Sequence, residues 1–285
     1  MRTMVDFREL DHEKVLALLP DRDPEGHKGT FGKILLLCGS RGYTGAAYFA
    51  AMGALRCGAG LVYLGVPESI YGIEAVKLNE PVVYPLPDEN GVYHPSAGID
   101  IRSRLEDMDA VLVGCGMGQG CGPFTVLKTV LQEATCPVVL DADGINLLKG
   151  HMDLLRGRRY PTVLTPHPGE FKRIGVLDED RTASAVALAK ESGAVVLLKG
   201  HRTVITDGSA VYQNPTGNPG MATGGSGDVL AGMITALLGQ GIGPLESAAC
   251  GAWLHGAAGD ICARELGQYS MLPSDILDVL PRLLK

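Results

Sequence analysis

An aspartate beside a run of glycines is the arrangement in this sequence that best suits catalysis. Asp228 follows Gly224-Gly225-Ser226-Gly227 and opens a helical pattern that continues to Leu238. The free N–H groups and partial positive charge at a helix start bind anions such as phosphate. A carboxylate beside them can take a proton from a hydroxyl while the amides stabilise the developing charge. Asp228 could also serve only as a helix-end charge, but that interpretation leaves the glycines unexplained. The segment therefore suits phosphoryl transfer to a hydroxyl group.

Two further polar segments follow apolar strand patterns. Thr165-Pro-His167-Pro-Gly-Glu170 comes after residues 162–164, and Lys199-Gly-His201-Arg202-Thr203 comes after residues 195–198. Ligands bind at the carboxyl ends of parallel strands, so both segments are well placed. Taken singly, His167 is typical of a structural histidine in a loop. Lys199 alone is typical of a surface lysine. Their position beside the glycine-rich helix start indicates one common site.

Glycine accounts for 39 of the 285 residues, about twice its usual share. Clusters lie at residues 39–45, 114–122 and 217–227, each beside a predicted strand end or helix start. The sequence contains no G-x-x-x-x-G-K-[ST], which excludes a P-loop enzyme. The G-x-G-x-G at residues 114–118 resembles a dinucleotide fingerprint only loosely, because Gly122-Pro123 interrupts it and the first acidic residue after it, Glu133, lies inside a predicted helix rather than at a strand end.

Short aliphatic runs alternate with Ala-rich segments of helical length, such as residues 45–56 and 181–192. The runs are apolar on both faces, which predicts parallel strands covered by helices on both sides. Asp207-Gly208 predicts a β-hairpin with a type I′ turn. Helical patterns follow at 226–238, 245–264 and 274–284, and no linker or repeat divides the chain. We therefore expect one α/β domain over residues 1–285, with strands at 33–38, 61–66, 110–113, 137–140, 162–164, 194–199 and 203–206.

The composition excludes several classes of protein. The net charge is -7 and no cluster of Lys and Arg exceeds three residues, which argues against nucleic-acid binding. No apolar run is long enough to span a membrane, and acidic residues occupy the place where a signal peptide would be apolar. The seven cysteines form no C-x-x-C pair. An odd number of cysteines in apolar runs is typical of buried thiols in a reducing cytoplasm.

Four motifs in the same order resemble the ADP/ATP-dependent NAD(P)H-hydrate dehydratases, a branch of the ribokinase-like fold. They are Gly29-Thr-Phe-Gly-Lys33, Thr165–Glu170, Leu198–Thr203 and Gly217–Asp228, and they span nearly the whole chain. The resemblance implies a three-layer α/β/α fold with a mostly parallel central sheet. It also implies repair of the S form of hydrated NADH and NADPH (NADHX and NADPHX). ADP would phosphorylate the C6 hydroxyl, and loss of phosphate would restore the nicotinamide ring and leave AMP and phosphate.

The resemblance also implies roles for individual residues. Asp228 would be the base, with an anion hole formed by the amides of Gly225, Ser226 and Gly227. Residues that would contact the hydrated substrate are Ala46, Gly118, His167 and Asp228, with Gly116 as an alternative to Gly118. Residues that would bind the adenine nucleotide are Lys199, Gly200, His201, Arg202, Thr203 and Gly227.

Magnesium is the implied cofactor. Glu170 would act on Mg²⁺ through water, and Asp141 and Asp143 are candidates for the same region or for turn and helix-cap residues. The second glycine turn departs from the family pattern Gly-Pro-Gly-Leu-Gly, because Cys115 stands in place of the proline.

Partners and alternatives follow from the same resemblance. The first motif begins near His27, which leaves no room for a fused epimerase domain, so we expect a separate epimerase. The family predicts a homo-oligomer, a tetramer, in which apolar C-terminal helices supply an interface. One alternative is a vitamin-precursor kinase, although those carry Asn-x-x-Glu where this chain has His167-Pro-Gly-Glu170. Another is a nucleotide sensor without activity, against which the intact Asp228 argues. The preferences between ADP and ATP, and between NADHX and NADPHX, stay open.

Overall fold

A ten-stranded sheet forms the centre of the computed structural model, which describes residues 6–285. From β10 across to β4 all neighbouring strands are parallel, whereas β11 is antiparallel to both of its neighbours. The sheet is therefore mostly parallel, as predicted. In spatial order its strands are β1 (Asp6–Arg8), β12 (Ala210–Gln213), β11 (Val204–Thr206), β10 (Val195–Leu198), β9 (Thr162–Leu164), β8 (Val138–Leu140), β7 (Ala110–Val113), β2 (Lys33–Leu37), β3 (Leu61–Pro67) and β4 (Val82–Leu86).

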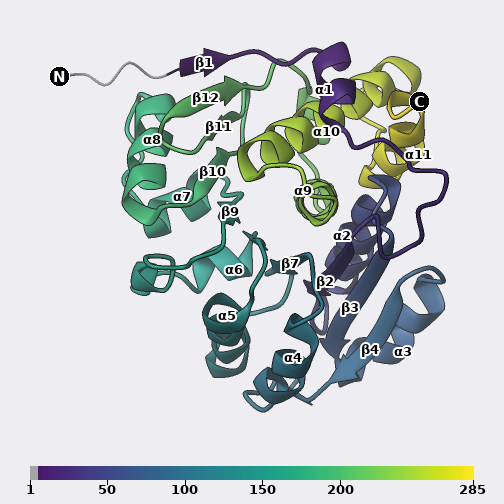
Figure 1. Ribbon diagram of the computed structural model, residues 1–285, viewed down its shortest axis with the longest axis vertical. Coiled ribbons are helices and arrows are strands. Elements are labelled where there is room, and N and C mark those ends of the chain that lie inside the picture. Colours follow the sequence, from purple (N-terminus) through teal and green to yellow (C-terminus); the bar gives the residue numbers. More distant parts are fainter. Residues whose placement is uncertain (1–5) are drawn as a thin grey trace.

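Helices cover both faces of this sheet (Figure 1). One layer contains α2 (Thr44–Arg56), α3 (Glu68–Lys77), α9 (Ser226–Gly239), α10 (Pro244–Leu266) and α11 (Pro273–Leu283), with α1 (His12–Leu18) against α10. The other contains α4 (Ala97–Leu105), α5 (Cys121–Glu133), α6 (Asp143–Asn146), α7 (Pro168–Ile174) and α8 (Arg181–Ser192). Strand β2 shows why residues 34–37 are all apolar: Ile34 and Leu36 belong to one core, and Leu35 and Leu37 to the other. The predicted three-layer α/β/α architecture is confirmed.

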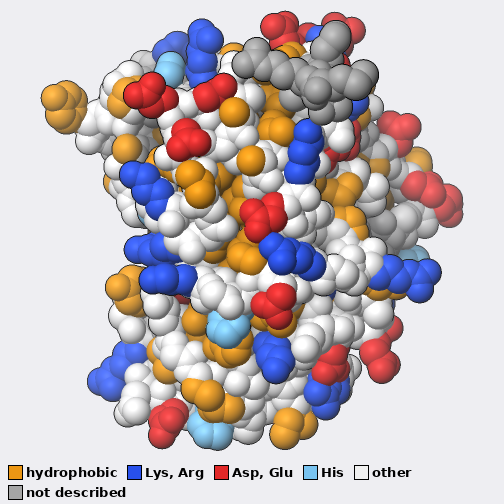
Figure 2. Space-filling view, turned by 90° about the vertical axis from the view of Figure 1, so that its left-hand side faces the viewer, with side chains coloured by type: hydrophobic (Ala, Val, Ile, Leu, Met, Phe, Trp, Pro, Cys, Tyr) orange, Lys and Arg blue, Asp and Glu red, His pale blue; other side chains and the backbone are white. Residues whose placement is uncertain are grey.

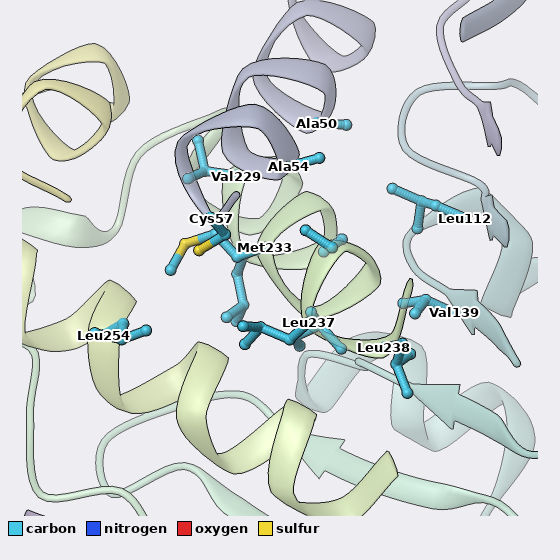
Figure 3. Packing of buried hydrophobic residues seen from close by; sticks show 14 of the residues in the cluster. Ala50, Ala54, Cys57, Leu112, Val139, Val229, Met233, Leu237, Leu238 and Leu254 are labelled. Carbon is cyan, nitrogen blue, oxygen red and sulfur yellow. The ribbon is translucent and has the colours of Figure 1, made fainter. Parts of the chain in front are cut away.

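Helices α2 and α9 pack backbone against backbone, because the residues at their contact include glycines. A Cβ at Gly53 would overlap the carbonyl of Val229, and a Cβ at Gly232 would overlap the carbonyl of Ala50. Figure 3 shows side chains of this layer, among them Ala50 of α2 and Val229 and Met233 of α9, together with Leu112 and Val139 of the sheet. Because only glycine permits so close an approach, the contact fixes the start of α9 relative to α2.

The structure differs from the sequence prediction at the sheet edges and at one turn. Strands β1 and β4, and the two-stranded ribbon of β5 (Asp88–Glu89) and β6 (Val92–Tyr93), were not predicted. The hairpin of β11 and β12 is confirmed, but its type I′ turn is wrong. Of the three connecting residues 207–209, only Gly208 has a positive φ, of 91°, whereas type I′ needs two such residues. Asp207 instead accepts hydrogen bonds from the amides of Ser209 and Ala210, at 2.8 Å each.

The surface carries charges of both signs. On the face shown in Figure 2, Lys and Arg side chains are interspersed with Asp and Glu rather than gathered by sign. Among residues 6–285, none of the helices combines the length and apolarity that crossing a bilayer requires. All seven cysteines are free thiols, and Cys121 is the exposed one.

Candidate functional site

Three polar residues come directly after three neighbouring strands of the sheet. Asp141 follows β8, Thr165 follows β9 and Lys199 follows β10. Thr165 Oγ1 and Lys199 Nζ both donate to Asp141 Oδ1, each at 2.7 Å. The carboxyl edge of the sheet thus gathers residues that are far apart in sequence, as expected for parallel strands.

The charged side chains at this sheet edge shift one another's pKa values. Burial lowers the pKa of Lys199, but the carboxylates of Asp141 and Glu170 outweigh it, so the pKa is raised overall and the ammonium stays charged. Glu170 Oε2 lies 3.9 Å from Lys199 Nζ. Burial raises the pKa of Glu170, and Lys199 opposes that effect. The site therefore carries a fixed positive charge beside two carboxyl groups.

His167 and Glu170 cap the start of α7 reciprocally. His167 Nδ1 accepts from the amides of Gly169 at 2.9 Å and Glu170 at 3.3 Å. In return, Glu170 Oε2 accepts from the amide of His167 at 2.8 Å. An accepting Nδ1 assigns the ring proton to Nε2, which lies 3.2 Å from Glu170 Oε1. This cap explains the spacing of the Thr-Pro-His-Pro-Gly-Glu segment and holds the imidazole at the cavity wall.

The glycine-rich segment before Asp228 forms the start of α9. Gly225 has a φ of 97°, and a Cβ there would lie 2.6 Å from the ring of Phe49, so glycine is required. Of the three amides predicted to form an anion hole, that of Ser226 already donates to Thr223 O at 3.3 Å. Within residues 6–285 the amides of Gly225 and Gly227 have no such acceptor. These two are therefore the amides available to an anion.

The Asp228 carboxyl has the electrostatic environment of a base. Burial and the negative charge of Asp141 raise its pKa to about 7, while the Cys115 thiol and Lys199 act in the opposite direction. One atom each from Cys115, Asp141 and Asp228 (the thiol sulfur and two carboxylate oxygens) lie within 4.8 Å of one another. A general base is most effective when its pKa is near the working pH.

A cavity of about 710 Å³ opens above these groups, within the size range of small-molecule sites. His255 of α10 lies in its wall, with Nε2 3.3 Å from Ser226 Oγ, and burial lowers its pKa to about 4. No spacing marked this neutral histidine in the sequence. The wall also includes residues 214–219 and 221–223. Predicted site residues that line the cavity are His167, Lys199, Gly200, His201, Arg202, Thr203, Gly225, Ser226, Gly227 and Asp228.

Arg181 shapes the cavity loop of residues 199–203. Its guanidinium donates to the carbonyls of Leu198 at 3.1 Å, Lys199 at 2.9 Å and His201 at 2.8 Å. Within the loop, Thr203 Oγ1 donates to Gly200 O at 2.9 Å. Arg181 opens the predicted helix 181–192, and only its tertiary position reveals this role.

Ala46 and the second glycine turn lie together beside the cavity rather than in its wall. A Cβ at Gly116 would be 2.8 Å from Ala46 Cβ, so these two residues are in contact. The amide of Gly118 donates instead to Asp143 Oδ2 at 3.0 Å. Asp143 Oδ1 accepts from Gln119 at 3.3 Å, so Asp143 serves as a turn residue.

The carboxylates do not fit a magnesium ion held directly by the protein. Asp141 accepts from Lys199, Thr165 and Cys115. Both oxygens of Glu170 face the amide or ring of His167. Asp228 has no hydrogen-bond donor among the side chains and amides of residues 6–285 beyond the neighbouring thiol, but a base needs its oxygens for the proton. Mg²⁺ is typically held by one or two carboxylates together with substrate phosphates and water.

Comparisons with known proteins agree on one family. A family profile described as NAD(P)H-hydrate dehydratase matches residues 34–282. The ADP-dependent (S)-NAD(P)H-hydrate dehydratase of Bacillus subtilis is 36% identical over 281 residues, which cover 96% of each chain. The Bifunctional NAD(P)H-hydrate repair enzyme Nnr of Moorella thermoacetica is 46% identical over 275 residues, covering 94% of this chain and 52% of that protein. The chain thus spans about half the length of its bifunctional relatives.

Solved structures give the same result. An ADP/ATP-dependent NAD(P)H-hydrate dehydratase from Bacillus subtilis, co-crystallised with ATP/Mg²⁺, superimposes with a TM-score of 0.84 at 34% identity, covering 98% of this chain and 97% of that one. A ribokinase-like superfamily protein from Enterococcus faecalis gives a TM-score of 0.85 at 29% identity, covering 98% and 95%. The ribokinase-like fold predicted from the motifs is confirmed.

Proposed function

The chain belongs to the NAD(P)H-hydrate dehydratase family, and from that premise we propose that it dehydrates the S form of NADHX and NADPHX at the expense of ADP. The products are NADH or NADPH, AMP and phosphate. The observation that carries this proposal is the Asp228 carboxyl at the start of α9, whose pKa is raised to about 7. It lies beside the available amides of Gly225 and Gly227.

In the proposed first step, Asp228 takes the proton of the C6 hydroxyl. The hydroxyl oxygen forms a bond to the β-phosphorus of ADP, and the bond from that phosphorus to the bridging oxygen breaks and releases AMP. The amides of Gly225 and Gly227 and the ammonium of Lys199 stabilise the negative charge on the transferring group. A pKa near 7 implies that turnover rises with pH through neutrality as the base ionises.

In the second step, the C6–O bond breaks and phosphate leaves with its electron pair. The lone pair of the ring nitrogen supplies the electrons, and loss of a proton from C5 restores the double bond of NADH or NADPH. The water of hydration is thereby consumed in cleaving ADP, so the overall reaction balances. Phosphate is a far better leaving group than hydroxide, which is why the nucleotide is needed.

We assign the cavity to the two ligands as follows. Residues 199–203 and Gly227 bind the adenine nucleotide, and the hydrated nicotinamide contacts His167 in the cavity wall and, beyond that wall, Ala46 and the turn of Gly116 and Gly118. The contact between Ala46 and Gly116 favours Gly116 as the residue nearer the substrate. Ser226, whose hydroxyl contacts His255, keeps the start of α9 in place.

Mg²⁺ enters this proposal as a companion of the nucleotide. The ion would be held mainly by phosphate oxygens and water, with Glu170 acting through water, and it would neutralise phosphate charge. A direct bond to Glu170 would displace its contacts to His167.

We further propose a homotetramer that works in the cytoplasm alongside a separate epimerase. Apolar side chains are exposed near the end of α10 and the start of α11, including Leu266, Tyr269 and Leu272, and they could form an interface between copies. Light scattering tests the assembly. With a mixture of R and S hydrates, only the S fraction should react until an epimerase is added.

The decisive experiment incubates the protein with enzymatically hydrated NADH and either ADP or ATP. Recovery of the absorbance band of reduced nicotinamide is expected, together with equal amounts of AMP and phosphate from ADP. Asp228→Asn should lower turnover by about 10²–10⁴-fold. Accumulation of a stable phosphorylated vitamin precursor, with no recovery of the band, would instead support the kinase alternative.

A further inference from the structure

Cys115 lies beneath the cavity at the end of β7. It stands between Gly114 and Gly116, whose φ angles are 129° and 59°. The side chain is completely buried, and it does not belong to the cavity wall. The turn therefore directs a thiol inward, toward the carboxyl edge of the sheet.

The thiol meets two carboxylates. Cys115 Sγ donates to Asp141 Oδ2 at 3.6 Å, and an oxygen of Asp228 completes a group whose atoms lie within 4.8 Å of one another. The other oxygen of Asp141 is occupied by Thr165 and Lys199. Cys115 is thus the donor on the side of Asp141 that faces Asp228.

The thiol remains protonated in this position. Contact with Cys38, burial and the charges of Asp141 and Asp228 together raise the pKa of Cys115 well above its ordinary value. It therefore acts as a hydrogen-bond donor rather than as a thiolate nucleophile. A negative charge beside Asp228 disfavours its ionisation, and a thiol donor between the two carboxyl groups opposes that effect.

We propose that Cys115 is a positioning residue for the base: its thiol, which donates to Asp141, holds the Asp228 carboxyl beside Asp141 at the floor of the cavity and favours the ionised form of Asp228. The proline that usually occupies this place in the family pattern has no side-chain donor. The role of Asp228 as base rests on the proposed function, whereas the hydrogen bond and its effect on the carboxyl group do not.

Other groups also face Asp228, and the test leaves them unchanged. Asp141, at the end of β8, and Glu170 of α7 raise its pKa, whereas Lys199, at the end of β10, lowers it. His255 of α10 contacts the neighbouring Ser226 and is neutral near pH 7. A change in the pKa of Asp228 that follows substitution of Cys115 alone can therefore be attributed to the thiol.

The experiment is a carbon NMR titration of the ligand-free full chain, labelled at aspartate side-chain carboxyls. The Asp228 signal is identified by its loss in Asp228→Asn. Cys115→Ala should raise the pKa of Asp228 by about half to one unit, because a donor to the ionised form is lost. Cys115→Ser, which restores a donor, should stay within about 0.2 units of the wild type.

Two further variants make the result decisive. Cys115→Val fills the space without a donor, so it should shift the pKa as Cys115→Ala does and serves if the alanine variant fails to fold. Cys250→Ala removes a buried thiol from α10 and should leave the pKa unchanged. An unshifted pKa in both Cys115→Ala and Cys115→Val, or an equal shift in Cys115→Ser, overturns the proposal. Because no substrate is present, a protein that failed to dehydrate NADHX would still give this answer.

Discussion

Lys199 Nζ lies 2.7 Å from Asp141 Oδ1, although 58 residues separate them in the chain. The strands that end at these residues flank β9, whose following residue Thr165 donates to the same oxygen. The ion pair is therefore both part of the sheet edge and the floor of the site. Its loss should affect folding and nucleotide binding together.

Lys199→Met should lower the free energy of unfolding by about 3 kcal/mol, because the buried Asp141 would lose its charged partner. The KM for ADP should also rise. Urea unfolding and steady-state kinetics measure the two effects. The control is Arg282→Met, which removes an exposed ion pair with Glu265 and should leave the urea midpoint nearly unchanged. Equal midpoints for the two variants would contradict this account.

Asp228→Asn should make the protein more stable as it becomes inactive. Burial raises the pKa of Asp228 in the folded state to about 7 from its ordinary value of 3.8. Folded protein therefore holds a proton that unfolded protein has lost, so this residue costs stability as pH rises from about 4 to about 7. Above that range the cost is constant, and the variant should be more stable than the wild type by about 4 kcal/mol at pH 8.

The measurement is the difference in unfolding free energy between Asp228→Asn and the wild type at pH 4, 6 and 8. The difference should be near zero at the lowest pH and grow toward the highest. A difference that is constant across the series would show that the pKa of Asp228 is not raised by folding.

Gly227→Ala should leave the fold intact and impair the reaction. A Cβ at this position would lie 3.4 Å from Lys199 Nζ, an ordinary contact, and 4.0 Å from Asp141 Oδ2. The methyl group would nevertheless stand where the transferring phosphoryl group must approach the amides. We expect kcat/KM for ADP to fall by about 10–100-fold, with an unchanged melting temperature.

Gly224→Ala is the matched control, because a Cβ there would meet no atom within 4 Å. It should retain activity close to that of the wild type. If both alanine variants lost activity equally, the effect would lie in the flexibility of the glycine segment and not in access to the amides.

Arg181→Met should raise the KM for ADP by about tenfold with little change in kcat, because the carbonyls of Leu198, Lys199 and His201 lose their donor. The affected loop contains the proposed nucleotide-binding residues 199–203. Arg156→Met removes an exposed pair with Glu191 and should leave both constants unchanged. A fall in kcat at constant KM would place Arg181 in the chemical step instead.

The site residues that were predicted from sequence share one property: each lies where a predicted strand ends or a predicted helix begins. His167, Lys199 and Asp228 each follow or open a strongly apolar segment, so their grouping at one sheet edge could be inferred from topology alone. Arg181 and His255 lie inside helical patterns and acquire their roles from tertiary neighbours. No spacing along the chain records such neighbours.

The missed strands have a similar explanation. β1 has three residues and pairs with β12, about two hundred positions away. β4 contains Pro85, which marks an edge strand and weakens its pattern. The turn after β11 differs from the prediction because hydrogen bonds that the Asp207 carboxylate accepts from backbone amides compete with the dipeptide preference.

The glycine contact between α2 and α9 sets a limit on how this protein can change. Gly53 lies against Val229, the residue directly after the proposed base. A larger residue at Gly53 would push the helices apart and move Asp228 away from Lys199 and the anion-binding amides. Selection for faster turnover should therefore spare this remote glycine while it alters the cavity walls. In a saturation library, position 53 should behave like a catalytic position, although its residue touches neither ligand.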